Sequence, residues 1–152
     1  MVQKKRVEQF LSQDTGLDLI ASGCIVESAS DDGYFVTPRL YACNNPDHLL
    51  AQQEIFGPVQ LVIPFDDEEH AVAIANGTEF GLVASVWSKD GGRQLRLAKK
   101  LRAGQVFINN YGAGGGVELP FGGVGKSGHG REKGFEALYG FSTVKTVAIK
   151  HG

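Results

Sequence analysis

Cysteine is scarce in this chain, and so are long apolar runs. Only Cys24 and Cys43 occur among 152 residues, which is too few for a disulfide framework and matches no metal-ligand spacing. No uninterrupted apolar run approaches the roughly 18 residues of a transmembrane helix. The basic start, with Lys4, Lys5 and Arg6, is not followed by the apolar region of a signal peptide. We therefore expect a cytoplasmic protein with no metal site and no membrane span.

An excess of charge of either sign is also absent. The 15 Lys and Arg residues nearly balance the 17 Asp and Glu residues, so the formal net charge is −2. This balance gives no electrostatic reason to expect nucleic acid or an anionic membrane as a partner. Hydrophobic residues make up 42% and charged residues 21% of the chain, an ordinary globular composition. The length fits one domain, which would bury roughly 68–70% of its unfolded surface if it folds alone.

The N-terminal part has the pattern of one helix and two strands. Apolar residues recur at helical spacing over residues 3–13, which predicts a short helix. Residues 20–28 and 34–43 resemble strands and are separated by a turn rich in Asp and Gly. Because Pro38 cannot donate to a sheet, part of the second strand is expected to be an edge or an irregular stretch.

The centre of the chain alternates between strand and helix. Three apolar runs predict strands at residues 59–63, 82–88 and 104–109. Two helices are expected between them, one that begins at Asp66 or Asp67 and stops at Asn76-Gly77, and one over residues 91–101. This order and spacing predict right-handed βαβ crossovers and a parallel sheet, so the expected fold class is α/β.

Glycine is the outlier: its 21 residues are about twice the usual frequency of ~7%. Residues 111–130 contain nine of them and have no helical or strand period, and a loop of this length inside a domain is usually functional. A short helix over residues 132–138 and an alternating strand over residues 142–150 follow. That strand has apolar residues on both faces, which suits pairing with another strand, including one in another subunit. We expect a domain over residues 1–141 and an oligomerisation strand over residues 142–152.

The segment Glu54-Ile55-Phe56-Gly57-Pro58 is the first candidate site. A carboxylate just before a strand can accept hydrogen bonds from a ribose diol, as acidic residues do in dinucleotide sites. Phe56 can pack on a planar ring, and the Gly-Pro pair would fix the turn that directs both side chains. An exposed glutamate and a core phenylalanine in an ordinary loop explain the same residues, and this alternative stays open.

The glycine-rich stretch at residues 119–132 is the second candidate. Lys126-Ser127 follows a glycine as in a phosphate-binding P-loop, but Pro120 stands where that motif needs its first glycine. A close-packed loop whose glycines adopt positive φ is therefore favoured over a phosphate site.

Cysteine and histidine give weaker signals. Both Cys24 and Cys43 lie in strand-like runs, so we expect them to be buried and unreactive. The four histidines show no metal spacing. Only His129, inside the glycine-rich loop, is a candidate, and a surface role is favoured for it.

Five motifs follow one another along the chain. They are Gly33-Tyr34-Phe35-Val36-Thr37-Pro38, Gln53-Glu54-Ile55-Phe56-Gly57-Pro58, Ala75-Asn76-Gly77-Thr78-Glu79-Phe80-Gly81-Leu82, Gly104-Gln105-Val106-Phe107-Ile108-Asn109, and Pro120-Phe121-Gly122-Gly123 with Lys126-Ser127-Gly128-His129-Gly130-Arg131-Glu132. Together they resemble the C-terminal portion of the NAD(P)-dependent aldehyde dehydrogenase superfamily. The resemblance covers nearly the whole chain, and it is carried by the order of all five motifs rather than by any one of them.

The resemblance implies a parent activity, the oxidation of an aldehyde to a carboxylic acid with NAD or NADP. It assigns Glu54 to the nicotinamide-ribose hydroxyls and Phe56 to packing near the nicotinamide. It also makes Phe121 an aromatic residue of the aldehyde tunnel and residues 111–119 the loop that shapes substrate choice. That loop is rich in glycine and lacks the aromatic side chains of many relatives, which implies a roomier or more mobile pocket mouth. Residues 143–150 correspond to the segment used in subunit association.

The resemblance also implies what the chain lacks. The family's catalytic cysteine, its general-base glutamate and its cofactor domain lie upstream of the matched region, and neither Cys24 nor Cys43 corresponds to the nucleophile. No catalytic residue is therefore expected here, and three hypotheses remain: a chain without turnover of its own, an assembly module that pairs through its terminal strand with itself or a full-length subunit, and one half of a split enzyme. Surface that the parent buries would be exposed, which predicts poor solubility or self-association.

Overall fold

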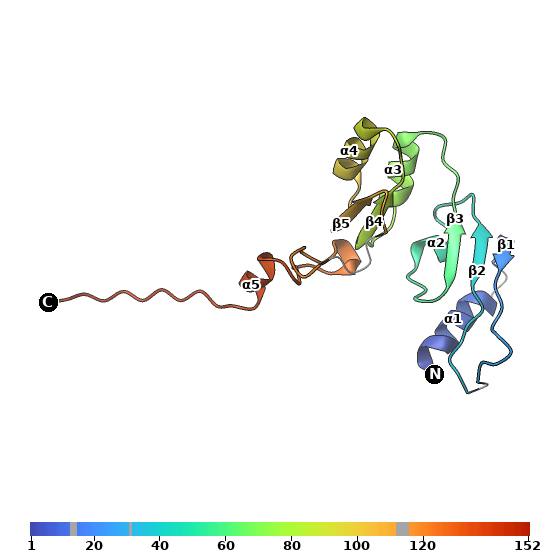
Figure 1. Cartoon of the computed structure of the whole chain (residues 1–152), viewed down its shortest axis with the longest axis horizontal. Coiled ribbons are helices and arrows are strands. Elements are labelled where there is room, and N and C mark those ends of the chain that lie inside the picture. Colours follow the sequence, from blue (N-terminus) through green and yellow to red (C-terminus); the bar gives the residue numbers. More distant parts are fainter. Residues whose placement is uncertain (13–14, 31, 112–115) are drawn as a thin grey trace. The chain divides into compact units, whose positions relative to one another are not determined.

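The structure is a computed structural model that describes residues 1–12, 15–30, 32–111 and 116–152. The chain divides into two compact units, Met1–Ile74 and Ala75–Gly152, and each unit has a sheet of its own (Figure 1). Parallel strands occur in both sheets, next to helices, so the predicted α/β class is confirmed. In the described part of the chain, no helix combines the length and the apolar character needed to cross a lipid bilayer.

The first unit contains a three-stranded sheet and helices that precede, interrupt and follow its strands along the chain. Its elements are α1 (Val2–Ser12), β1 (Asp18–Ser22), β2 (Arg39–Ala42), α2 (Leu49–Gln52), β3 (Val59–Val62) and the start of α3 (Glu68–Asn76). The strand order is β1-β2-β3, with β1 antiparallel and β3 parallel to β2. Helix α1 confirms the helix predicted from apolar spacing near the N-terminus.

The first two strands are shorter than predicted, and Pro38 explains why. Proline has no amide hydrogen to donate, and β2 begins only at the next residue, Arg39. The carbonyl oxygen of Pro38 still accepts a hydrogen bond from the amide of Gly23 at 2.9 Å. Because β1 pairs from Asp18 opposite Ala42 to Ser22 opposite Arg39, a four-residue β2 leaves no partner for residues 24–28.

The core of this unit is small. Val7, Leu50 and Ile55 form its buried centre, and the side chain of Val7 is only 2% exposed. Gly57 allows α1 to approach this centre closely, since a Cβ atom at that position would lie 2.7 Å and 2.9 Å from the two methyl carbons of Val7. The core therefore joins α1, α2 and the residues just before β3.

The second unit contains a βαβ crossover. Strand β4 (Val83–Val86), helix α4 (Gly91–Lys100) and strand β5 (Gln105–Ile108) follow one another, and the two strands are parallel. Strands β3 and β4 belong to different units and to different sheets of the described chain, so the crossover predicted between residues 59–63 and 82–88 is not seen. Apolar runs identify strands, but they do not specify which strand pairs with which.

Side-chain caps fix where the two long helices of this region begin. The amide of His70 donates to the carboxylate of Asp67 at 2.8 Å, so Asp67 rather than Asp66 caps α3. Asp90 caps α4 by accepting from the amide of Arg93 at 3.1 Å. This hydrogen bond to the charged carboxylate lowers the pKa of Asp90 from its ordinary value of 3.8. Helix α3 ends at Asn76, as the Asn-Gly pair predicted.

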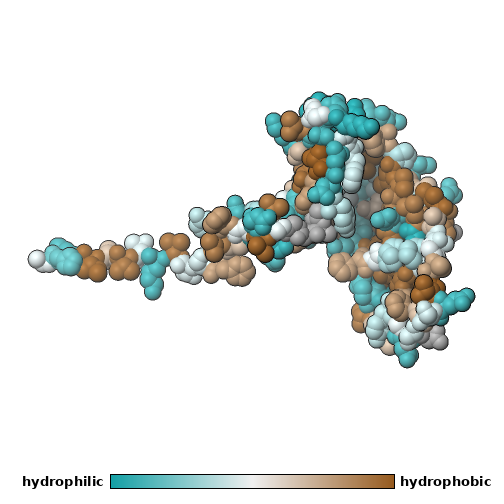
Figure 2. All heavy atoms as spheres, viewed as in Figure 1, coloured by the Kyte–Doolittle hydropathy of each residue, from teal (hydrophilic) through white to brown (hydrophobic). Residues whose placement is uncertain are grey.

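The C-terminal elements differ from the expectation. The short helix predicted at residues 132–138 begins later, as α5 (Glu136–Gly140). The strand predicted over residues 142–150 has no hydrogen-bonded strand partner in the described chain, and it continues from α5 as an extended trace (Figure 1). Figure 2 shows apolar and polar residues alternating along it. Without a partner strand among the described residues, this segment stays extended and unpaired.

Candidate functional site

The Glu54–Pro58 segment leads from α2 into β3 and presents two exposed side chains. The carboxylate of Glu54 is exposed and has no hydrogen-bond partner in the ranges that the structure describes. Phe56 is 71% exposed, so the alternative of a core phenylalanine is wrong. Its φ is 58°, in the left-handed region that bulky residues rarely adopt. Such strain is concentrated at functional sites, where the surrounding structure enforces it.

Helix α1 holds this segment in place. The side-chain amide of Gln3 donates to the carbonyl oxygens of Ile55 at 3.1 Å and Phe56 at 3.0 Å. The guanidinium of Arg6 donates to the carbonyl oxygen of Glu54 at 2.7 Å. Gln3, Arg6 and Val7 lie on one face of the helix, since they are three and four residues apart. Together they fix the backbone of a segment whose two exposed side chains, Glu54 and Phe56, are left out of these contacts.

The sequence analysis missed Gln3 and Arg6. Their spacing with the apolar Val7 was visible, but a polar residue beside an apolar stripe is typical of any amphipathic helix. Nothing in the sequence indicated that their partners lie about fifty residues away. Two hydrogen bonds from one amide group to consecutive carbonyls are a feature that only the folded chain shows.

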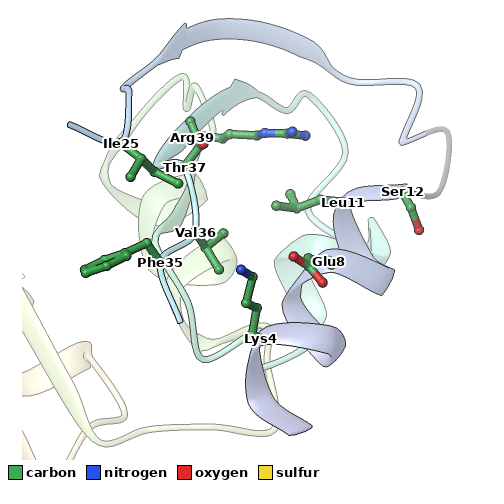
Figure 3. Close-up of a pocket in the computed structure, with 9 residues that line it drawn as sticks. All are labelled: Lys4, Glu8, Leu11, Ser12, Ile25, Phe35, Val36, Thr37 and Arg39. Carbon is green, nitrogen blue, oxygen red and sulfur yellow. The ribbon is translucent and has the colours of Figure 1, made fainter. Parts of the chain in front are cut away.

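Three hollows surround α1 and the candidate segment. One, of about 410 Å³, is lined by Glu54, Phe56 and the apolar residues of α2 and β3. A second, of about 310 Å³, lies between α1 and Phe56. The third, of about 330 Å³, lies between α1 and residues 35–39, and Figure 3 shows Lys4 and Glu8 rising from the helix on one side of it and Val36 and Arg39 on the other. Only the first two include the candidate segment, which therefore borders concave, open surface.

In the second unit, the glycine-rich stretch is a packed loop. The amide of Val124 donates to the carbonyl oxygen of Gly81 at 3.0 Å, and the amide of Lys126 donates to that of Glu79 at 2.7 Å. A Cβ atom on Gly104 would overlap the carbonyl oxygen of Gly122, so only glycine fits there. Gly125 has a φ of 60°, as a close-packed glycine loop requires.

The two side chains that a P-loop would turn toward phosphate have other partners. The ammonium group of Lys126 pairs with the carboxylate of Glu79. The hydroxyl of Ser127 accepts a hydrogen bond from the amide of Gly81 at 3.0 Å. The favoured interpretation, a close-packed loop rather than a phosphate site, agrees with this geometry.

Phe121 is half-buried in the second unit. It forms an isolated antiparallel bridge with Glu132, with amide-to-carbonyl distances of 2.6 Å and 2.7 Å. The ammonium of Lys133 lies 5.6 Å from the centre of its ring. Of the expected substrate loop, residues 112–115 lie outside the described residues, and Tyr111 and Val117 on either side are exposed.

The cysteines and histidines divide unevenly. Cys43 is buried and its thiol donates to the carbonyl oxygen of Asn45 at 3.0 Å, as expected of an unreactive cysteine. The expectation that Cys24 is buried is wrong, because β1 ends two residues before it and leaves it exposed. His129 is exposed. Across the described ranges, no group of three His, Cys, Asp or Glu side chains is arranged to hold a metal ion.

The sequence as a whole matches one known family. The sequence model of the aldehyde dehydrogenase family covers residues 2–147. The chain belongs to the aldehyde dehydrogenase family. Its curated aldehyde dehydrogenase relatives include the betaine aldehyde dehydrogenase of Rhizobium leguminosarum bv. trifolii, 40% identical over 99% of this chain. The 4-trimethylaminobutyraldehyde dehydrogenase A of Danio rerio is 46% identical over 80% of it.

Solved aldehyde dehydrogenase structures agree with this assignment. One from Burkholderia cenocepacia is 60% identical, covers the whole of this chain and has a TM-score of 0.91. The Mycobacterium tuberculosis aldehyde dehydrogenase, solved with NAD⁺, is 38% identical over 92% of this chain, with a TM-score of 0.83. The chain spans 31% of the Rhizobium enzyme and 32% and 29% of the two structures, so it corresponds to a part of an aldehyde dehydrogenase.

Proposed function

We propose that this chain forms the C-terminal part of an aldehyde dehydrogenase catalytic domain and supplies part of its NAD(P) site. Glu54 accepts hydrogen bonds from the nicotinamide-ribose hydroxyls, and Phe56 packs near the nicotinamide ring. The observation that carries this proposal is the unpartnered Glu54 carboxylate beside a strained, exposed Phe56, both on a backbone held by Gln3 and Arg6. An exposed carboxylate and an exposed ring fit a diol and a planar ring.

The chain contributes binding and orientation to this chemistry. A bound nicotinamide takes up the hydride as the aldehyde is oxidised. The step needs an attacking thiolate. Cys43 is buried, and in this proposal neither it nor the exposed Cys24 is that nucleophile. Phe121 lines the aldehyde tunnel in this proposal, and the isolated chain has no turnover of its own.

A chimera tests the cofactor site directly. The upstream part of the Mycobacterium tuberculosis aldehyde dehydrogenase is joined to this chain, and NAD⁺ binding and aldehyde oxidation are measured. Glu54→Gln is expected to weaken cofactor binding at least tenfold, because the amide keeps one acceptor oxygen but loses the negative charge and the second acceptor. Glu69→Gln, which makes the same charge change at an exposed position of α3, is the matched control. Equal binding by the Glu54→Gln and Glu69→Gln chimeras would end the proposal.

The isolated chain is tested separately. Purified protein is mixed with NAD⁺ or NADP⁺ and a panel of aldehydes, and NADH or NADPH formation is followed by absorbance. We expect no turnover above a blank in which both Cys24 and Cys43 are replaced by Ser. Turnover that depends on either thiol would contradict the proposal that the nucleophile is supplied elsewhere.

An assembly role is the second candidate, and the exposed terminal segment favours it. The side chains of Val144, Val147 and Ile149 are exposed, and the segment around them pairs with no strand in the described chain. In this proposal the segment pairs with a second copy, with a full-length subunit, or with a separate upstream half that completes a split enzyme. Inspection of the adjacent reading frame for the missing cysteine and cofactor domain separates the last option from the others.

A further inference from the structure

His48 is held by both nitrogens of its ring. It is the N-cap residue of α2, and its Nδ1 lies 3.1 Å from the amide nitrogen of Leu50. Its Nε2 lies 2.9 Å from the carbonyl oxygen of Thr15, 33 residues earlier in the chain. In the sequence, this histidine shows only that it does not have the spacing of a metal ligand.

The two partners determine where the ring hydrogen lies. A backbone amide can only donate, so Nδ1 accepts from Leu50, and a carbonyl can only accept, so Nε2 carries the hydrogen toward Thr15. The ring is therefore neutral, in the Nε2–H tautomer. Asparagine, a common cap, could accept the hydrogen bond from the amide of Leu50. Its side chain is too short to donate a second hydrogen bond to the carbonyl oxygen of Thr15 at the same time.

These bonds act on a short and dependent element. Helix α2 has only four residues, which is far below the length at which a helix is stable by itself. Its Leu50 packs with Val7 and Ile55 in the buried centre of the first unit. The amide of Gln53 closes the helix by donating to the carbonyl oxygen of Leu49 at 3.0 Å, and Glu54 follows directly. The position of α2 thus sets where the candidate segment starts.

We propose that His48 is a positioning residue for Glu54 and Phe56. By tying the start of α2 to Thr15, it fixes Leu50 and Ile55 in the core and so fixes the segment between and after them. His48 itself touches neither cofactor nor substrate in this account. The cofactor role of Glu54 and Phe56 rests on the proposed function. The effect of His48 on where these two residues lie is measured without any cofactor.

Nuclear magnetic resonance on the full chain tests it. The ring nitrogens of His48 are expected to show the Nε2–H tautomer. In His48→Ala, the amides of Ala51, Gln52 and Gln53 are expected to exchange roughly fivefold faster, as a lost cap predicts. In His48→Asn, the restored cap returns their exchange toward the wild-type rate. The amide shifts of Glu54 and Phe56 stay displaced in both variants, because neither replaces the tie to Thr15.

The exposed His70, which contacts only its own neighbourhood at the start of α3, gives the matched control, His70→Ala. The proposal is overturned if the ring carries its hydrogen on Nδ1, or if His48→Asn restores the Glu54 and Phe56 shifts to those of the control. If His48→Ala does not fold, the Asn variant decides alone. Displaced shifts together with unchanged cofactor binding in the Glu54→Gln chimera would reject the proposed function and keep the positioning role.

Discussion

At the scale of single residues, the candidate segment combines a strained backbone with a crowded one. Phe56 adopts a left-handed conformation that glycine would adopt without cost, while Gly57 next to it has an ordinary φ but no room for a side chain. A phenylalanine therefore stands where the backbone conformation favours glycine, and a glycine stands where close packing excludes a side chain. The left-handed conformation of Phe56 costs stability, and a functional role of its ring would explain why it is kept.

The backbone strain gives the first prediction. Phe56→Gly relieves the positive φ, and Phe56→Ala removes the ring but keeps the strain. We expect Phe56→Gly to be more stable than Phe56→Ala by about 1 kcal/mol, since the left-handed conformation costs about that much for a residue with a Cβ atom. Urea unfolding of the two variants measures the difference. A less stable glycine variant would mean that the strain is absent in solution.

The crowding at Gly57 gives the second. In Gly57→Ala the new methyl group meets both methyl carbons of Val7, and overpacking of this kind costs about 1–3 kcal/mol. The double variant Gly57→Ala with Val7→Ala should lose less than the sum of the single losses, because the clash is gone. Gly91→Ala, where the added carbon meets open space, is the control in the same unfolding experiment. Additive losses would show that the two side chains do not touch.

At the scale of elements, helices α3 and α4 each depend on one carboxylate at their start. Asp67 caps α3 and Asp90 caps α4, and both satisfy amide groups that the helix itself leaves without partners. The crossover of the second unit therefore depends on a group whose charge changes in acid.

The third prediction concerns this dependence. The hydrogen bond from Arg93 lowers the folded-state pKa of Asp90 below 3.8. Its stabilisation is therefore present above that pH and is lost as the pH falls through the lowered pKa. Unfolding midpoints of wild type and Asp90→Asn, measured between roughly pH 6 and pH 2.5, should converge in acid, because the neutral amide caps at every pH. Parallel curves across the whole range would contradict the assignment; Glu69→Gln serves as the charge control.

Elements were predictable where local chemistry decides them. The Asn-Gly pair ends α3, Pro38 shortens β2, and alternation of strand and helix gives the crossover of the second unit. The sequence did not predict the pairing correctly: a single parallel sheet was expected, but β3 pairs with β2 in one sheet and β4 with β5 in another, and residues 142–150 have no strand partner among the described residues. Pairing depends on contacts between distant segments, which periodicity does not encode. For the same reason Glu54 and Phe56 could be singled out from their motif, whereas Gln3, Arg6 and His48, which act on them from elsewhere, could not.

At the scale of the whole molecule, the chain exposes much apolar surface for its size. Among the described residues, the exposed apolar side chains near the C-terminus are Phe135, Leu138, Tyr139, Phe141, Val144, Val147 and Ile149. The buried hydrophobic residues in the described ranges are Val7, Tyr41, Cys43, Leu50, Ile55 and Val86. Exposed apolar surface of this extent marks a site of association or a liability for aggregation.

The fourth prediction follows from this surface. The purified chain should self-associate at micromolar concentration, as seen by size-exclusion chromatography with light scattering. Replacing Val144, Val147 and Ile149 by Thr should shift the population toward monomer, because the apolar face of the terminal segment is removed while its extended preference is kept. Substitution of the equally exposed Val2 in α1 is the control. A monomer at every concentration would count against both the prediction and the assembly role.

The parallel pair β4 and β5 has a practical consequence. No third strand pairs with either of them among the described residues, so each strand keeps one edge without a strand partner there. A synthetic peptide would pair with such a strand edge as an added strand. Methylation of the amides on its outward-facing edge would prevent a further strand from pairing with the peptide. The peptide would improve the solubility of this chain. Its displacement would also report the binding of a natural partner at the same strand edge.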